Sequence, residues 1–409
     1  MKKITLHGGN PLYGEISVGG SKNAALPIIF ACILTKGVSC IRNLPDIGDV
    51  RVALEILRSF GAEISFNNGI TNIDTNKLSY SLPDKFLVSQ IRASTYLIGS
   101  CLARFGRCHI QTFGGCNFAQ RPIDMHIDAC LALGAELFGN EIVAKKLCGG
   151  EINFEKKSVG ATVNAILLAS VAEGETLIRG IAREPHIDAL IDFLISCGAH
   201  INRNGDDLYI SGAELHGGQI TIIGDMIEAG TYLVAGLITG GEVSVVNCPV
   251  HNMQAIFQGL EDLGSEISIK GSIVSARIVG MGNPVNIVAL PYPGFPTDLQ
   301  PIFAPLMAAF SGGKITDTVW QTRFGYLKAL SEFGVDYLIK GNSAEIRPSS
   351  IKNSIAVCPD LRGGMACLLT ALRATGKSEI LSAEIILRGY ENLEEKLCAL
   401  GTDVFIENL

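Results

Sequence analysis

The sequence has 409 residues, 47% of them hydrophobic and 18% charged, which excludes a disordered chain and allows two or three domains with full cores. The formal net charge of −7 gives no overall attraction to nucleic acid or to an anionic membrane, so an anionic ligand needs a local basic cluster. The sequence has no apolar run of roughly 18 residues and no signal sequence, so we expect a soluble cytoplasmic protein. Its 12 cysteines include no C-x-x-C pair, so we expect neither disulfides nor zinc.

Six segments of the chain share one pattern. A leucine lies a few residues before a glycine, and a strand-like run follows the glycine. The segments are "LRSFGAEI", "LALGAEL", "LISCGAHI", "LEDLGSEI", "LSEFGVDY" and "LCALGTDV". Each predicts an amphipathic helix that ends at a left-handed glycine, followed by a strand. These glycines are Gly61, Gly134, Gly198, Gly264, Gly334 and Gly401, separated by 73, 64, 66, 70 and 67 residues.

A second set of segments alternates with the first. Each predicts a helix that is apolar all round, starting near residues 24, 93, 161, 229, 299 and 363, then a glycine and a strand. The chain is therefore six copies of a unit of about 68 residues. The apolar helices must be buried, while strands such as "EVSVVN" offer one polar face and lie outside.

The six repeats divide into three plus three, which predicts two α/β domains with buried helices and outer sheets. We place the crossovers near residues 21 and 224. The domains are then 22–223 and 1–21 with 224–409, and the first strand, "ITLHG", completes the second domain.

The starts of the buried helices carry charged residues. Lys22, Arg92 and Arg362 are basic, whereas Asp225 and Asp298 are acidic. Helix N-termini bind anions, so starts that converge on an interdomain cleft suit a polyanionic ligand beside acids for proton transfer. Alternatively, the basic residues are solvated and the acids are N-caps. The segment "KSVGAT" resembles a phosphate loop but lacks the P-loop spacing.

The segment "FGGCNFAQRP" places Cys116 after two glycines, Gly114 and Gly115, which predicts a loop. Arg121 and His126 follow closely and would lower the pKa of a thiol below its usual value of about 8.5. The alternative is an idle surface cysteine. His126 itself falls on a helical pattern and is interpreted as structural.

Seven segments in chain order, "GSKNAALPI", "RPIDMHI", "SVGAT", "AREPHI", "FPTDLQ", "DLRGG" and "RGYENLEEKL", together resemble the UDP-N-acetylglucosamine enolpyruvyl transferase family. The resemblance implies a two-domain inside-out α/β barrel with the active site in the interdomain cleft. It implies transfer of the enolpyruvyl group of phosphoenolpyruvate to the sugar 3-hydroxyl, through a tetrahedral phospho-ketal and with release of phosphate. This is the first committed step of peptidoglycan synthesis, in the cytoplasm. The partners implied are these two small molecules, without cofactor, metal, nucleic acid or membrane.

The resemblance also implies roles for single residues. Cys116 is the acid, Lys22 assists it, Asp298 is the base for the sugar hydroxyl, and Arg388 completes the catalytic set. Fosfomycin would alkylate Cys116. Asp225 and Glu228 lie near the hinge, and Arg323 aligns with a cleft arginine. The phosphoenolpyruvate contacts are Lys22, Asn23, Arg92, Arg121, Arg362 and Arg388. The UDP-sugar contacts are Arg121, Pro122, Ile123, Asp124, Met125, Lys156, Ser158, Val159, Gly160, Asp298 and Val319.

Three positions depart from the family pattern: Gly48 replaces a frequent lysine, and Ile385 and Leu387 replace His and Asp. The segment "WQTRF" before and including Arg323 is also atypical. Three alternatives therefore stay open. They are a sister transferase acting on shikimate 3-phosphate, a transferase acting on another nucleotide, and a non-catalytic paralogue that binds UDP-sugars.

Overall fold

The computed structural model describes residues 1–409 except 111–112, 115–121 and 281. The described residues form two compact units. Among the described residues, the first unit comprises 20–114 and 122–223, and the second comprises 1–19 and 224–409. Each is described by itself.

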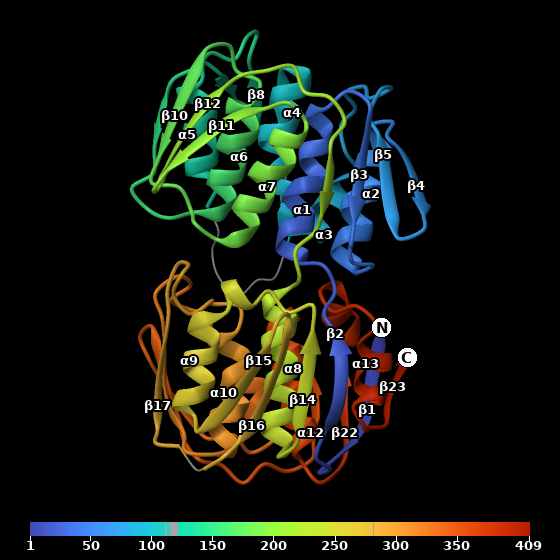
Figure 1. The fold of residues 1–409 in the computed structure, drawn as a ribbon, viewed down its shortest axis with the longest axis vertical. Helices are drawn as coiled ribbons and strands as arrows, with labels where there is room; N and C mark the ends of the chain where they lie inside the picture. The colour runs from blue at the N-terminus through green and yellow to red at the C-terminus, as the bar shows by residue number, and fades with distance from the viewer. Residues whose placement is uncertain (111–112, 115–121, 281) are drawn as a thin grey trace. The chain divides into compact units, whose positions relative to one another are not determined.

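The first unit begins with a buried helix and repeats the order helix, strand, helix, hairpin (Figure 1). Its helices are α1 (Lys22–Ala31), α2 (Gly48–Ser59), α3 (Lys85–Gln90), α4 (Leu97–Phe105), α5 (Asp124–Ala132), α6 (Val159–Ala169) and α7 (Pro185–Ser196), with 3-10 turns η1 (Cys32–Leu34) and η2 (Arg92–Tyr96). Its strands are β3 (Val38–Arg42), β4 (Glu63–Asn67), β5 (Ile70–Asp74), β6 (Arg107–His109), β7 (Glu136–Phe138), β8 (Glu141–Val143), β9 (Glu151–Asn153), β10 (Glu175–Arg179), β11 (His200–Asn204), β12 (Asp207–Ser211) and β13 (Gln219–Thr221).

The second unit repeats the same order and includes the N-terminal strands. Its helices are α8 (Met226–Thr239), α9 (Gln254–Asp262), α10 (Gln300–Ala309), α11 (Leu327–Ser331), α12 (Leu361–Arg373) and α13 (Leu393–Ala399), with 3-10 turns η3 (Val250–Asn252) and η4 (Ala383–Arg388). Its strands are β1 (Lys2–Gly8), β2 (Tyr13–Ser17), β14 (Glu242–Val246), β15 (Ser265–Lys270), β16 (Ile273–Ile278), β17 (Val285–Ala289), β18 (Gly313–Asp317), β19 (Tyr337–Lys340), β20 (Ser343–Ile346), β21 (Ile355–Val357), β22 (Gly376–Leu381) and β23 (Val404–Asn408).

Five of the six sheets among the described residues share one pairing rule. The strands β3, β10, β14, β18 and β22, each of which follows a buried helix, pair in parallel with one neighbour and antiparallel with the other. The N-terminal strand β1, blue in Figure 1, lies antiparallel between β22 and β23. The two ends of the chain therefore share one sheet of the second unit.

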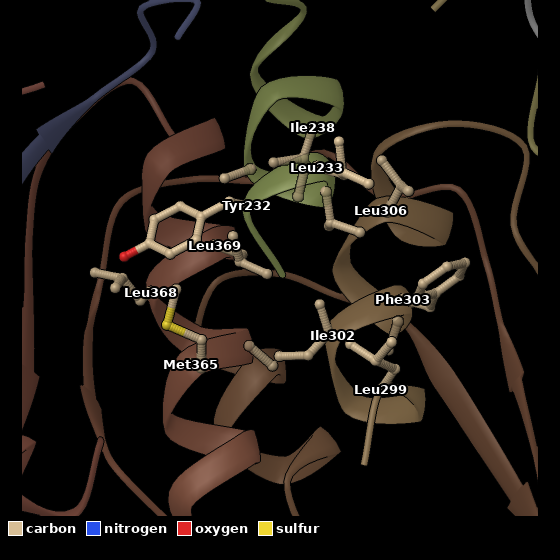
Figure 2. Close-up of a cluster of buried hydrophobic side chains, with 14 of the residues drawn as sticks. Tyr232, Leu233, Ile238, Leu299, Ile302, Phe303, Leu306, Met365, Leu368 and Leu369 are labelled. Atoms are coloured by element: carbon tan, nitrogen blue, oxygen red, sulfur yellow. The ribbon is translucent and has the colours of Figure 1, made fainter. Parts of the chain in front are cut away.

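The helices α8, α10 and α12 form the core of the second unit, as the prediction of apolar, fully buried helices requires. Every residue of α8 from Ile227 to Thr239 is buried. Figure 2 shows side chains of the three helices meeting, among them Leu233, Phe303 and Leu368, each 0% exposed. Strand β14 in turn buries alternate residues and exposes Glu242. The expected α/β class, with helices inside and sheets outside, is confirmed.

The predicted helix-ending glycines are confirmed. All six adopt the left-handed conformation, with φ between 89° and 100°. In the first repeat α2 ends at Ser59, Gly61 follows with φ of 100°, and β4 begins at Glu63. The sequence period is thus a repeat of backbone geometry.

Candidate active site

Lys22 opens helix α1 and pairs with a carboxylate from the next helix. Its Nζ lies 2.9 Å from Oδ2 of Asp49. Asp49 is in the first turn of α2, where the helix dipole favours an acid, and its side chain is 5% exposed against 15% for Lys22. The ammonium is therefore held at the N-terminal end of α1 by a mostly buried partner. Asn23 follows as a half-buried residue of the same turn.

Gly48, one of the departures from the family pattern, is the first residue of α2. It immediately precedes Asp49. The residue before the helix, Ile47, supplies no side-chain cap. The substitution leaves the pairing of Asp49 with Lys22 in place.

Helix α5 begins in the segment expected to contact the UDP-sugar. Pro122 and Asp124 are exposed, and Ile123 and Met125 are half-buried. The next residue, His126, is buried, as its structural interpretation predicted.

The side chain of Asn164, on α6, fixes the imidazole of His126. Its Nδ2 lies 2.6 Å from Nδ1 of His126 and donates to the carbonyl of Thr95 at 3.0 Å, while its Oδ1 accepts from the backbone N–H of Gly99 at 2.8 Å. Arg92 begins η2 as a half-buried residue, and burial lowers the pKa of its guanidinium. Its charge also acts to lower the pKa of His126.

The N-terminus of α6 carries the second group of expected UDP-sugar contacts. Ser158 is the N-cap, and its hydroxyl accepts a hydrogen bond from the N–H of Ala161 at 3.3 Å. Val159 and Gly160 open the helix as half-buried residues, whose N–H groups have no intrahelical acceptor in an α-helix. An 11-residue helix with such a start favours an anionic group.

The lysines before this helix differ. Lys156 is exposed. Lys157 instead pairs with Asp206 at 2.5 Å and donates to the carbonyl of Ile181 at 3.0 Å. Both lysines are exposed residues, and the Lys157 ammonium is held by Asp206 and the Ile181 carbonyl.

In the second unit, two arginines contact the carboxylate of Asp298. Nη1 of Arg323 lies 2.8 Å from Oδ1, and Nε and Nη2 of Arg362 both lie 3.2 Å from Oδ2. Arg323 is 3% exposed and Arg362 2%, whereas the Asp298 side chain is 28% exposed. Asp298 is therefore a partly exposed carboxylate that is held by two buried arginines.

Val319, another expected UDP-sugar contact, follows strand β18 and is half-buried. Its N–H and that of Trp320 both donate to Oδ1 of Asp317, at 2.9 and 2.7 Å. Asp317 is 0% exposed. The backbone of this turn is therefore organised by a buried carboxylate.

Arg362 lies in the first turn of α12, whose N-cap is Asp360. The cap carboxylate accepts hydrogen bonds from the N–H groups of Arg362 and Gly363, each at 3.0 Å. The Arg362 guanidinium lies 5.3 Å from the ring centre of Tyr390. The hydroxyl of Tyr390 is 3.0 Å from that of Thr231.

Arg388 ends the 3-10 turn η4 and is half-buried, two residues before Tyr390. The two departures in this turn, Ile385 and Leu387, pack against the core of the second unit. The packing of these two apolar side chains therefore fixes the turn that carries Arg388 to the core.

The acids expected near the hinge lie at the start of α8. Asp225 is its N-cap and accepts from the N–H groups of Ile227 and Glu228. Glu228 pairs with Lys396 at 2.6 Å and accepts from the N–H of Gly19 at 2.8 Å. Burial raises the pKa of Glu228, and Lys396 opposes that shift.

Two expected site residues, Cys116 and Arg121, lie outside the described residues. Within the described ranges, no group of three or more His, Cys, Asp and Glu side chains could hold a metal ion. No helix among those residues has the length and hydropathy of a membrane span.

Comparison with known proteins identifies the family. The family model described as EPSP synthase (3-phosphoshikimate 1-carboxyvinyltransferase) matches residues 6–397. The chain belongs to this family of enolpyruvyl transferases. The UDP-N-acetylglucosamine 1-carboxyvinyltransferases of Halothermothrix orenii and Clostridium botulinum are 40% and 38% identical to this enolpyruvyl transferase, each over 99% of both chains. The predicted resemblance is confirmed.

Solved structures agree with the fold of this enolpyruvyl transferase. The enolpyruvyl transferase NikO from Streptomyces tendae matches with a TM-score of 0.90 and 23% identity, over 100% of this chain and 99% of that chain. An EPSP synthase from Acinetobacter baumannii matches with a TM-score of 0.72 and 18% identity over 100% of both. Sequence identities of 23% and 18% support a similarity of fold alone.

The sequence analysis missed Asp49, Asp317 and Tyr390. Each had a local signal: Asp49 is an acid at the start of an amphipathic helix, Asp317 ends a strand before a turn, and Tyr390 follows Arg388 closely. Their side-chain partners, however, are distant along the chain. Asp49 and Lys22, for example, are 27 residues apart.

Proposed function

We propose that this enolpyruvyl transferase moves the enolpyruvyl group of phosphoenolpyruvate to the 3-hydroxyl of UDP-N-acetylglucosamine and releases phosphate. The observation that carries the proposal is the identity of 40% over 99% of both chains with a UDP-N-acetylglucosamine 1-carboxyvinyltransferase. Lys22 and Asp298, each in an ion pair at a helix start, supply charged groups of the kinds that the reaction needs.

The proposed reaction is an addition followed by an elimination. In the addition, the methylene carbon of phosphoenolpyruvate gains a proton from Cys116, assisted by Lys22, and the sugar oxygen bonds to the adjacent carbon. Asp298 takes the hydroxyl proton as general base. In the elimination, the phospho-ketal loses phosphate and a methyl proton. Arg388 offsets the negative charge on phosphate.

The proposed binding residues follow the same assignment. Phosphoenolpyruvate contacts Lys22, Asn23, Arg92, Arg121, Arg362 and Arg388. The UDP-sugar contacts residues 121–125, Lys156, 158–160, Asp298 and Val319. Phosphoenolpyruvate and the UDP-sugar are both anionic. Arginine suits them because its planar guanidinium makes two hydrogen bonds to a phosphate or carboxylate. The N-terminus of α6 supports a diphosphate contact for the same electrostatic reason.

We further propose that residues 22–223 and residues 1–21 with 224–409 are two domains serving this one reaction. The cellular role would be cytoplasmic peptidoglycan synthesis, with consequences for cell shape and division. Fosfomycin would inhibit the enzyme by alkylating Cys116.

The test is phosphate release from phosphoenolpyruvate with UDP-N-acetylglucosamine or shikimate 3-phosphate as acceptor. Release with the UDP-sugar alone supports the proposal. Release with shikimate 3-phosphate alone would favour the sister activity of a 3-phosphoshikimate 1-carboxyvinyltransferase. If neither acceptor supports turnover while the UDP-sugar binds, the chain is a non-catalytic paralogue or acts on another nucleotide.

A further inference from the structure

A groove lies on the sheet of the second unit whose strands follow the order β17, β18, β20, β19; its edge strand β17 is labelled in Figure 1. The groove has a volume of about 470 Å³, which is in the range of small-molecule sites in proteins. Lys314 lines it near the start of β18, whereas Asp317 of the candidate active site is at the other end of that strand. None of the residues lining the groove is assigned to the proposed reaction.

The strand register places a row of groove residues on one face of the sheet. Four exposed residues are successive partners across the strands: Asn286, Lys314, Glu345 and Leu338. The next row along the strands includes Ile315 and Ala344, which are each 0% exposed. Because side chains alternate between the two faces of a strand, the row of four lies on the face away from the core.

One end of the groove is built from closely packed backbone. Gly312 and Gly313 have φ of 71° and 144°, in the region that favours glycine. A Cβ at Gly313 would clash with the carbonyl oxygen of Val285, and one at Gly312 would lie 2.8 Å from Cδ of Pro348. This end of the groove is therefore fixed by the fold itself.

The charges in the groove are unevenly paired. Nη1 of Arg347 lies 3.0 Å from Oδ2 of Asp336, and its Nε lies 3.7 Å from Oε1 of Glu345. This one guanidinium therefore serves both carboxylates. Among the residues that the structure describes, neither Lys314 nor Lys340 has a carboxylate oxygen within 4.0 Å of its ammonium.

The two unpaired lysines are close enough to contact one ligand. Lys314 is opposite Glu345 and Lys340 is opposite Ser343, so strand β20 lies between the two lysines. Neighbouring strands are about 4.8 Å apart, which places β18 and β19 about 10 Å from each other. Because each ammonium is carried on a flexible four-carbon stem, both can reach an anion that lies over β20.

The other lining residues indicate the rest of the ligand. A phosphate monoester carries a charge of about −1.5 to −2 near pH 7, which the two ammonium groups match. Leu338 is 39% exposed, and with Pro284 and Pro348 it offers apolar surface for a flat ring. Glu345 and Asn286 can accept hydrogen bonds from sugar hydroxyls. Phosphate, hydroxyls and a flat ring are together the groups of a nucleotide.

We propose that this groove binds a nucleoside monophosphate. The phosphate lies between the ammonium groups of Lys314 and Lys340, and the base lies against Leu338. The net charge of the chain is −7, so attraction of an anion to this face depends on the two local lysines. The inference does not rest on the proposed function, because the groove shares no residue with the proposed reaction.

Lysine acylation by an N-hydroxysuccinimide ester, read residue by residue with mass spectrometry, tests the proposal on the full-length chain. The probe is adenosine 5′-monophosphate, and uncharged adenosine is its counterpart. At about 10 mM, the nucleotide should slow the acylation of Lys314 and Lys340 at least fivefold, because the bound phosphate covers both amines. Adenosine should change either rate less than about twofold. Lys270, an exposed lysine on β15, should react at the same rate throughout.

The variant Lys314→Gln tests whether the two lysines hold the same anion. It should raise about tenfold the nucleotide concentration that half-protects Lys340, because one charge-assisted contact is lost. The matched control Lys270→Gln should leave that concentration unchanged. Lys314 is exposed, so the melting temperature of its variant should stay close to that of wild type. The measurement on wild type needs neither variant.

Four results would overturn the proposal. One is unchanged acylation of Lys314 and Lys340 with the nucleotide, and another is equal slowing at Lys270, which would show ionic screening alone. A third is half-protection of Lys340 that Lys314→Gln does not alter. The fourth is stronger protection by glucose 6-phosphate or by a tetraglutamate peptide than by the nucleotide, because the groove would then select a sugar phosphate or an acidic peptide.

Discussion

His126 provides the sharpest prediction about stability. Its Nδ1 faces the amide nitrogen of Asn164, whose orientation is set by Gly99 and Thr95. Nδ1 must therefore accept a hydrogen bond, which leaves the proton of the neutral ring on Nε2. That edge lies against Gly160, where a methyl group would come within 3.0 Å of Nε2. A second ring proton on Nδ1 would point at the amide donor of Asn164.

Burial, and then the charge of Arg92, lowers the pKa of His126 from 6.5 to about 4. Because the folded pKa lies below the unfolded one, the unfolded chain binds the proton first as the pH falls. Stability is thus lost from about pH 7 downwards, until the folded protein is protonated near pH 4. At 1.36 kcal/mol per pKa unit, the loss between pH 7 and pH 5 is about 2 kcal/mol.

The perturbation is His126→Gln, with His200→Gln as the control because His200 is exposed. Urea unfolding followed by circular dichroism at pH 7 and pH 5 should show a fall in the free energy of unfolding that is about 2 kcal/mol smaller in His126→Gln than in wild type. The control should keep the wild-type fall. Proton NMR of the ring resonances of the 7 histidines should show one, absent in His126→Gln, that does not titrate above pH 5.

Two results would refute the reasoning. One is a His126 resonance that titrates near 6.5. The other is an equal pH dependence of stability in wild type and His126→Gln.

Three further predictions follow from other sites. Asp49→Asn removes the counter-charge of Lys22 and should lower kcat for phosphate release about tenfold or more, with the melting temperature within a few degrees of wild type. Phe303→Ala empties space in the core of the second unit and should cost about 3–5 kcal/mol in urea unfolding, whereas the same change at Phe86, which is 71% exposed, should cost under about 0.5 kcal/mol. Cys116→Ser should be inactivated by fosfomycin at least 100-fold more slowly than wild type, because the thiolate is the stronger nucleophile.

Each of these predictions has a contrary outcome. Unchanged turnover in Asp49→Asn would mean that Lys22 needs no partner to act. Equal costs for the two phenylalanine changes would contradict the packing of α8, α10 and α12. Wild-type inactivation of Cys116→Ser would remove Cys116 from the proposed site.

The repeats and the burial of the helices were predictable from the sequence because they depend on local patterns. Six glycines at a common period end six helices in the left-handed conformation, which residues with a Cβ rarely adopt. Segments that are apolar all round cannot form a stable exposed helix, so burial follows from composition. The residues at the N-termini of the buried helices could also be predicted from the sequence, because polar residues before an apolar run mark the start of a helix.

The partners of those residues could not be predicted in the same way. Lys22 meets Asp49 across 27 residues, and Asp298 meets Arg323 across 25 and Arg362 across 64. The sequence by itself determined which charged side chains stand at the helix starts. Only the tertiary structure decided which charges meet and which oxygen of Asp298 is held more closely, because packed helices and loops bring distant residues within hydrogen-bond distance.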